Sequence, residues 1–197
     1  MKGTWLTSDG ITLGYEVYQA APDKLFTILN TPKQGIFERG FNGQTGWEKS
    51  SRGIRDLEGT QLFYLKRYPD LFKDIKLQGQ FSRISFSRKE KIDGKDVYLL
   101  SGIGLDGKGE RLYFDTQTGL LVRRITSTRT MVGLIPEQVD YEDYRDVDGM
   151  KVPFTIRITS LDSFYSSTRK FTEIKLNVPV DETKFNKPAG PAPSPVP

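Results

Sequence analysis

The chain has 197 residues, of which 36% are hydrophobic and 27% are charged, a composition typical of one globular domain with a substantial core. Cysteine and histidine are both absent, which excludes thiolate or imidazole zinc sites, cysteine nucleophiles, Ser-His-Asp triads and histidine acid–base chemistry. The net charge is +4, and the basic residues are scattered in small groups rather than gathered in the stripe typical of nucleic-acid binders.

Turn signals and strand-like segments follow one another along the chain. Asx-Gly pairs, which supply the positive φ angles of tight hairpins, recur from Asp9-Gly10 to Asp148-Gly149. Between them apolar and polar residues alternate with period two, as from Ile11 to Val17. The expected strands are 11–17, 24–30, 35–41, 81–89, 97–103, 110–114, 120–126, 138–145, 151–158 and 169–177. They predict a mainly β protein whose antiparallel sheet has about ten strands.

A one-sided sheet of this size must curl around its apolar face or be covered there. The segment 56–75 is the predicted cover, because its apolar residues recur at helical spacing and Asp56 is a suitable N-cap. Pro69 interrupts this segment, so we expect a kinked helix or two short helices. The end of the chain is rich in proline, and the expected organisation is one domain over residues 1–187 and a tail over 188–197.

Three local patterns have both a functional and a structural interpretation. The carboxylates of 140–149 suggest a calcium loop, but Tyr144 and Thr155 occupy positions where an EF-hand-type loop needs acidic residues, so a hairpin turn is favoured. The glycines of 102–109 suggest a phosphate loop, but no Walker lysine follows them. Trp47, after the turn 42–46, is suited either to stacking on a ligand or to packing in the core.

Membrane-spanning and export signals are missing from the sequence. No apolar run approaches the ~20 residues that span a bilayer, so the chain is not expected to span a membrane. The residues after Met1 lack the apolar region of a signal peptide. The location of the protein must therefore be inferred from other features.

Three segments of the sequence together resemble the LolA/LolB-like superfamily of outer-membrane lipoprotein-sorting proteins. These are the segments 37–47, 113–121 and 140–154, each a strand–turn–strand signature without a catalytic motif. The resemblance implies an incomplete, strongly curved antiparallel half-barrel covered by one or two helices, with an apolar cavity that receives acyl chains in the carriers. It also implies a periplasmic or envelope-associated location.

One departure from the carriers is that strand-like sequence starts almost at Met1, where they have an amphipathic helix. Similar domains also form C-terminal parts of larger envelope proteins, including acidobacterial proteins that look like c-type cytochromes. A domain taken from such a protein would explain both the start of the sequence and the proline-rich tail.

The first functional hypothesis is a noncatalytic binding module for a lipid acyl chain or another hydrophobic ligand, with no cofactor and no metal. Its partners would be a hydrophobic ligand, a lipidated protein or other envelope proteins, and not nucleic acid. The second hypothesis is a structural or interaction domain with a self-filled cavity, and the third is an enzyme that works through carboxylates. The predicted ligand-binding residues are Trp47, Leu62, Phe63, Leu65, Phe72, Tyr98, Leu100 and Phe114.

Overall fold

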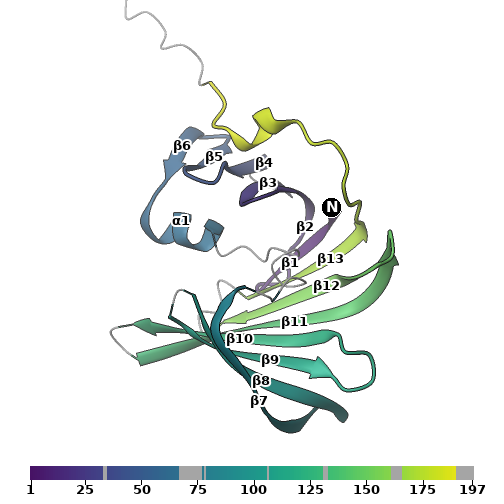
Figure 1. Ribbon diagram of the computed structural model, residues 1–197. Helices are drawn as coiled ribbons and strands as arrows, with labels where there is room; N and C mark the ends of the chain where they lie inside the picture. The colour runs from purple at the N-terminus through teal and green to yellow at the C-terminus, as the bar shows by residue number, and fades with distance from the viewer. Residues whose placement is uncertain are drawn as a thin grey trace, which may run out of the picture. The chain divides into compact units, whose positions relative to one another are not determined.

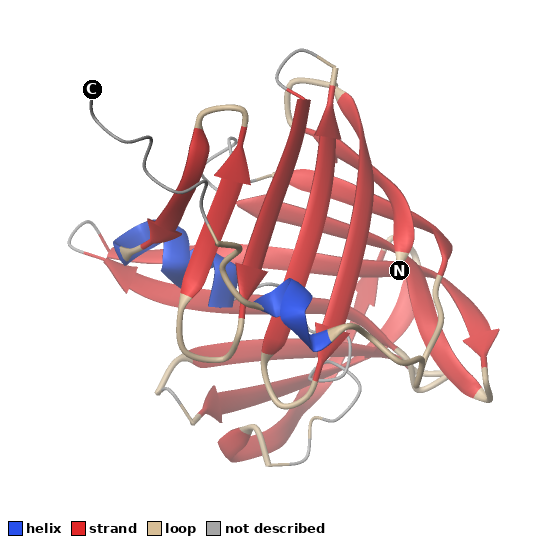
Figure 2. Ribbon diagram, turned by 90° about the horizontal axis from the view of Figure 1, so that it is seen from above, coloured by secondary structure: helices blue, strands red, loops and turns tan. Residues whose placement is uncertain are grey.

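Strands make up most of the protein (Figures 1 and 2). The structure is a computed structural model that describes residues 1–32, 35–66, 77, 79–105, 107–130, 133–160 and 166–189. Its strands are β1 (Lys2–Thr7), β2 (Thr12–Ala20), β3 (Lys24–Thr31), β4 (Gly35–Phe41), β5 (Gly46–Ser50), β6 (Gly53–Leu57), β7 (Phe81–Ile92), β8 (Lys95–Gly104), β9 (Gly109–Asp115), β10 (Leu121–Thr130), β11 (Gly133–Val147), β12 (Met150–Ser160) and β13 (Ser167–Glu173). The helical elements in these ranges are α1 (Gly59–Lys66) and the 3₁₀ turn η2 (Glu182–Phe185).

The thirteen strands of these ranges form one sheet, in the order β6-β5-β4-β3-β2-β1-β13-β12-β11-β10-β9-β8-β7. From β2 to β6 and from β7 to β12, each strand pairs antiparallel with the next one along the chain. The sheet is open, with β6 and β7 as its terminal strands, and does not close into a barrel. The predicted open antiparallel sheet is therefore confirmed.

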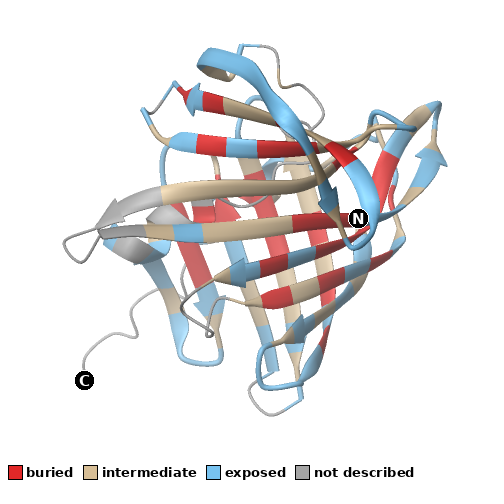
Figure 3. Cartoon of the chain, turned by 90° about the horizontal axis from the view of Figure 1, so that it is seen from below, coloured by how far each residue is buried: buried red, intermediate tan, exposed pale blue. Residues whose placement is uncertain are grey.

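The turn chemistry and the alternation of side chains explain the hairpins. Asp93-Gly94 connects β7 to β8, and Asp148-Gly149 connects β11 to β12. In each pair φ is 50° at the aspartate and 80° at the glycine, and positive φ at both residues suits a two-residue hairpin turn. In β2 the residues Leu13, Tyr15 and Val17 are buried and the residues between them are more exposed. Figure 3 shows the same alternation of buried and exposed bands along other strands.

All ten predicted strands are present, and the segments Lys2–Thr7, Gly46–Ser50 and Gly53–Leu57 form three strands in addition to those ten. The strand-like sequence near Met1 and the strand–turn–strand signature of 37–47 pointed to the first two, whereas nothing in the pattern indicated Gly53–Leu57. The predicted start of the helix at Asp56 is wrong, because Asp56 pairs with Trp47 in the β5–β6 ladder and α1 begins at Gly59. The predicted continuation beyond Lys66, with Pro69, lies outside the described residues. No helix in the described ranges is long and apolar enough to cross a membrane.

The chain divides into two compact units. Unit 1 comprises the described residues within 1–5, 12–70 and 171–197, and unit 2 those within 6–11 and 71–170. The single domain expected over residues 1–187 stays a prediction.

In unit 1 the two faces of the sheet have different covers. On one face Trp47, 2% exposed, packs with Phe26 and Phe185, and its indole nitrogen donates a 2.9 Å hydrogen bond to the carbonyl of Phe185 in η2. On the other face α1 packs against β5, since a Cβ on Gly46 would lie 2.8 Å from Leu62 Cδ1. The C-terminal segment and the helix therefore cover opposite faces of this part of the sheet.

In unit 2 both faces of the sheet carry apolar side chains. Val97, Leu99 and Tyr113 form a buried cluster on one face of β8 and β9. The opposite face carries Leu112, which is 0% exposed. Strand pairing through β10 places the buried Tyr141 of β11 on this same face. The strands of unit 2 thus have two apolar surfaces, one on each side.

The contact between Gly40 and Trp47 gives a stability prediction. A Cβ on Gly40 would lie 2.3–2.6 Å from atoms of the Trp47 ring, which Phe26 and Phe185 hold in place. We expect Gly40→Ala to lower the free energy of unfolding by about 2–4 kcal/mol through overpacking, measured by urea denaturation.

Gly14→Ala is the matched control for this prediction. Gly14 also lies within a strand, and an added Cβ there would meet Asn30 at 3.6 Å, which is ordinary contact. Its effect should stay within about 1 kcal/mol. Equal stability of Gly40→Ala and Gly14→Ala would contradict the packing described for Trp47.

Candidate ligand-binding site

An apolar strip crosses β7, β8 and β9 on one face of unit 2. Cross-strand register places Phe86 opposite Leu100, and Tyr98 opposite Phe114. Directly paired residues and residues two apart share a face of a strand, so these side chains, together with Ile84, point to the same side. We call Ile84, Phe86, Tyr98, Leu100 and Phe114 the β7–β9 strip.

The β7–β9 strip is open to solvent at its outer end. Phe86 is 60% exposed and Ile84 is 42% exposed, whereas Tyr98, Leu100 and Phe114 are half-buried. Single exposed apolar residues are common on protein surfaces, but neighbouring ones on one face form a patch that favours binding. The strip is therefore the candidate ligand-binding surface of unit 2.

A bulge in β7 brings a cation to the same surface. The register shifts between Phe86 and Arg88, so Lys89 pairs with Tyr98 and faces the strip, although it is three residues from Phe86. A regular strand would place Lys89 on the opposite face. The Lys89 ammonium lies 5.2 Å from the centre of the Tyr98 ring, within the range of a cation–π interaction.

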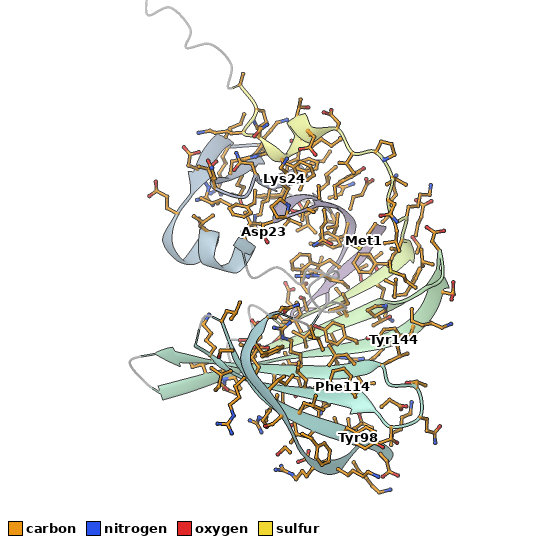
Figure 4. The ribbon with its side chains drawn as sticks, in the orientation of Figure 1. Met1, Asp23, Lys24, Tyr98, Phe114 and Tyr144 are labelled. Carbon is orange, nitrogen blue, oxygen red and sulfur yellow. The ribbon has the colours of Figure 1, made fainter. Side chains whose placement is uncertain are left out.

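An aromatic contact joins β7 and β8 at the centre of the strip. The rings of Phe86 and Tyr98 lie 6.1 Å apart at an interplanar angle of 70°, an edge-to-face geometry. Figure 4 shows Tyr98 on β8 and Phe114 on the neighbouring strand β9. Tyr98 therefore has Phe86, Lys89 and Phe114 as neighbours on one surface.

The structure brings together only part of the predicted ligand-binding set within its described residues. Tyr98, Leu100 and Phe114 lie side by side on the strip. Trp47 is a buried core residue of unit 1, on the face of the sheet opposite to the one where Leu62 and Leu65 pack against Gly46. Hence Trp47 does not share a surface with those two leucines.

Two predicted residues lie outside what is described, and two site residues were not predicted. The side chain of Phe63 and the whole of Phe72 fall outside the described part of the chain. Ile84 and Phe86 were missed, although their alternation with Ser85 and Ser87 was a signal that could have indicated them.

A charged cluster lies on the α1 face of unit 1. The buried carboxylate of Glu48 accepts hydrogen bonds from Arg39 Nε at 2.7 Å and from Arg55 Nη2 at 2.8 Å, and Arg55 also donates to Gln61 of α1 at 2.8 Å. Burial alone would raise the pKa of Glu48, but the two guanidinium groups outweigh it and lower the pKa below its ordinary value. Glu48 is therefore an ionised partner of two arginines rather than a proton donor.

Three carboxylates of the segment 140–149 are paired with arginines, and a fourth, Asp146, is paired with Lys151. Asp140 accepts from Arg123, Glu142 from Arg157 at 3.0 Å, and Asp143 from Arg145 at 2.7 Å. In the described ranges no three Asp or Glu residues gather into a group able to hold a metal ion. Asp148 belongs to the hairpin turn, as the favoured interpretation of this segment expected.

No protein-family model and no curated protein sequence matches the chain significantly. Solved structures do match it, and each of the three that follow aligns with 94% of this chain. A LolA superfamily protein from Nitrosomonas europaea has a TM-score of 0.61 at 19% identity, with 87% of that chain covered. A domain from Vibrio parahaemolyticus, provisionally described as an outer membrane lipoprotein-sorting protein domain, has a TM-score of 0.60 at 14% identity, with 88% covered.

The third structure is a DUF1329 family protein from Desulfovibrio piger, with a TM-score of 0.59 at 10% identity and 87% of that chain covered. At these identities the likeness shows the fold. The resemblance to the LolA-like superfamily that the segments 37–47, 113–121 and 140–154 indicate is thus confirmed at the level of fold.

The Glu48 cluster gives a prediction on pH. Because the pKa of Glu48 is lowered in the folded protein, its ion pairs stabilise the fold above the pKa of an unfolded glutamate, about 4.3, and this stabilisation is lost as the pH falls through the folded value. We expect Glu48→Gln to lower the free energy of unfolding by about 1–3 kcal/mol near pH 7, and this difference from the wild type to shrink below about pH 4.

The measurement is urea denaturation of both proteins between about pH 3 and pH 7. Glu142→Gln is the control, since the pair of Glu142 with Arg157 is exposed and should contribute less than about 1 kcal/mol. A stability difference for Glu48→Gln that stays constant down to pH 3 would contradict the assignment.

Proposed function

We propose that this protein is a noncatalytic binding module of the bacterial envelope, and that the β7–β9 strip accepts an acyl chain or another hydrophobic ligand. The observation that carries the proposal is the exposure of Phe86 and Ile84 next to the half-buried Tyr98, Leu100 and Phe114. Covering such a surface gains about 25 cal/mol for each Å² of apolar area removed from water.

The dimensions of the strip suit a linear apolar ligand. Adjacent strands lie about 4.8 Å apart, so Phe86 on β7 and Phe114 on β9 are separated by roughly 10 Å across the sheet. A methylene group gains about 0.8 kcal/mol when it is fully buried, and about half of that when one side is covered. A chain of eight or more methylenes along the strip would therefore gain roughly 3 kcal/mol or more.

The structural comparisons support the choice of ligand and location. One similar structure is described as a LolA superfamily protein and another as an outer membrane lipoprotein-sorting domain. We take from them that the ligand is a lipid or the acyl chains of a lipidated protein, and that the protein works in the periplasm or at the envelope.

A noncatalytic role agrees with the chemistry of the chain. The chain has no cysteine or histidine to serve as nucleophile or neutral-pH base. The buried carboxylate of Glu48 is held in its ionised form by Arg39 and Arg55, so it is not poised to transfer a proton.

Binding of the neutral fluorescent probe N-phenyl-1-naphthylamine tests the proposal, together with native mass spectrometry for co-purified lipid. We expect saturable binding by the wild type and at least about tenfold weaker binding by Phe86→Glu, because a carboxylate in the strip would lose its hydration under the ligand. Phe86 is largely exposed, so the variant should keep the unfolding midpoint of the wild type.

Ile36→Glu is the matched control, since Ile36 is 55% exposed on β4 of unit 1 and lies outside the strip. It should bind the probe as the wild type does. Undiminished binding by Phe86→Glu, or no binding by the wild type, would refute the proposal, and the second outcome would favour a structural or docking role.

A further inference from the structure

We infer that the β7–β9 strip selects single-chain amphiphiles with an anionic head group, and that Lys89 binds that head group. The inference rests on the proposed function and specifies its ligand. It follows from the position of Lys89 at the edge of the strip and from the charges around it.

The position of Lys89 depends on the bulge in β7. Because the register shifts between Phe86 and Arg88, Lys89 lies on the same face of the sheet as Phe86 and Tyr98 instead of on the opposite face. Its ammonium lies 5.2 Å from the centre of the Tyr98 ring. The pair of Lys89 with Tyr98 lies toward the end of the β7–β8 hairpin that carries the turn Asp93-Gly94. The strip therefore has an apolar body and a cationic end.

The charges next to Lys89 on β7 are already paired. The guanidinium of Arg88 pairs with Glu90, and the ammonium of Lys91 lies 3.1 Å from the carboxylate of Asp96. Within the described ranges no carboxylate lies within 4 Å of the Lys89 ammonium. Lys89 is thus available to pair with a charge that a ligand supplies.

The chemistry of the ammonium group identifies the ligand class. Lysine has three N–H donors and no acceptor, and the Tyr98 ring occupies one side of the cation. A carboxylate or phosphate oxygen can accept from the remaining donors, while the attached chain extends over Phe86 and Tyr98. A neutral lipid would leave this charge unmatched.

Protection of the sheet edge does not explain this geometry. Lysine on an edge strand discourages pairing with other chains, and β7 is a terminal strand of the sheet. That role requires a charge somewhere on the strand, and Arg83, Arg88 and Lys91 already supply it. It does not require Lys89 to lie over Tyr98 on the same face as the exposed Phe86.

The test compares laurate with dodecanol, which have the same chain length, as competitors of N-phenyl-1-naphthylamine at about pH 8, where laurate is ionised. We expect the wild type to bind laurate about three- to tenfold more tightly than dodecanol, since a partly exposed charge-assisted contact contributes modestly. Lys89→Gln should abolish the preference and keep the affinity for dodecanol within about twofold of the wild-type value.

Lys91→Gln is the matched control, because Lys91 lies on the same strand but is paired with Asp96. It should retain the preference for laurate. Equal affinities of the wild type for laurate and dodecanol would overturn the inference and leave the proposed function intact, whereas failure of the probe itself to bind would overturn both. Binding to phosphatidylglycerol vesicles without binding of monomeric laurate would also overturn the inference, because the occupant would then be a membrane surface.

Discussion

Backbone pairing between strands that follow one another in the chain is the constraint on which the rest of the structure depends. Since side chains alternate along a strand, the register of each pair decides which residues share a face. In β7, β8 and β9 this register gathers Phe86, Leu100, Tyr98 and Phe114 on one surface. A single extra residue in β7 then adds Lys89 to it, so one bulge gives the apolar strip its charged end.

The sequence was sufficient to predict the open antiparallel sheet and ten of its strands, because alternation and Asx-Gly turns are local signals. The set of ten did not include β5 and β6, which are short and contain several charged residues; only the strand–turn–strand signature of 37–47 pointed to the start of β5. Their strand conformation comes from pairing with β4, a non-local interaction. The same pairing places Asp56 in a strand, although its side chain suits a helix N-cap.

The candidate site was predictable to the extent that it follows from alternation. Tyr98, Leu100 and Phe114 were predicted and lie together, since each lies on a regular strand. Phe86 was not predicted; its alternation with Ser85 and Ser87 indicates which face it shares, but its exposure of 60% is a property of the folded chain and not of the local pattern. For Trp47, an aromatic residue after a glycine-rich turn suits both a ligand site and a core, and is more often core; its packing with Phe26 and Phe185 depends on tertiary structure.

The proposed function requires that an acyl chain lies on the β7–β9 strip. The most direct measurement is the paramagnetic broadening of amide NMR signals by stearate that carries a nitroxide on its chain. We expect broadening centred on Phe86, Tyr98, Leu100 and Phe114, with the signals around Ile36 unaffected. Broadening centred instead on α1 near Leu62, or none at saturating ligand, would contradict the claim.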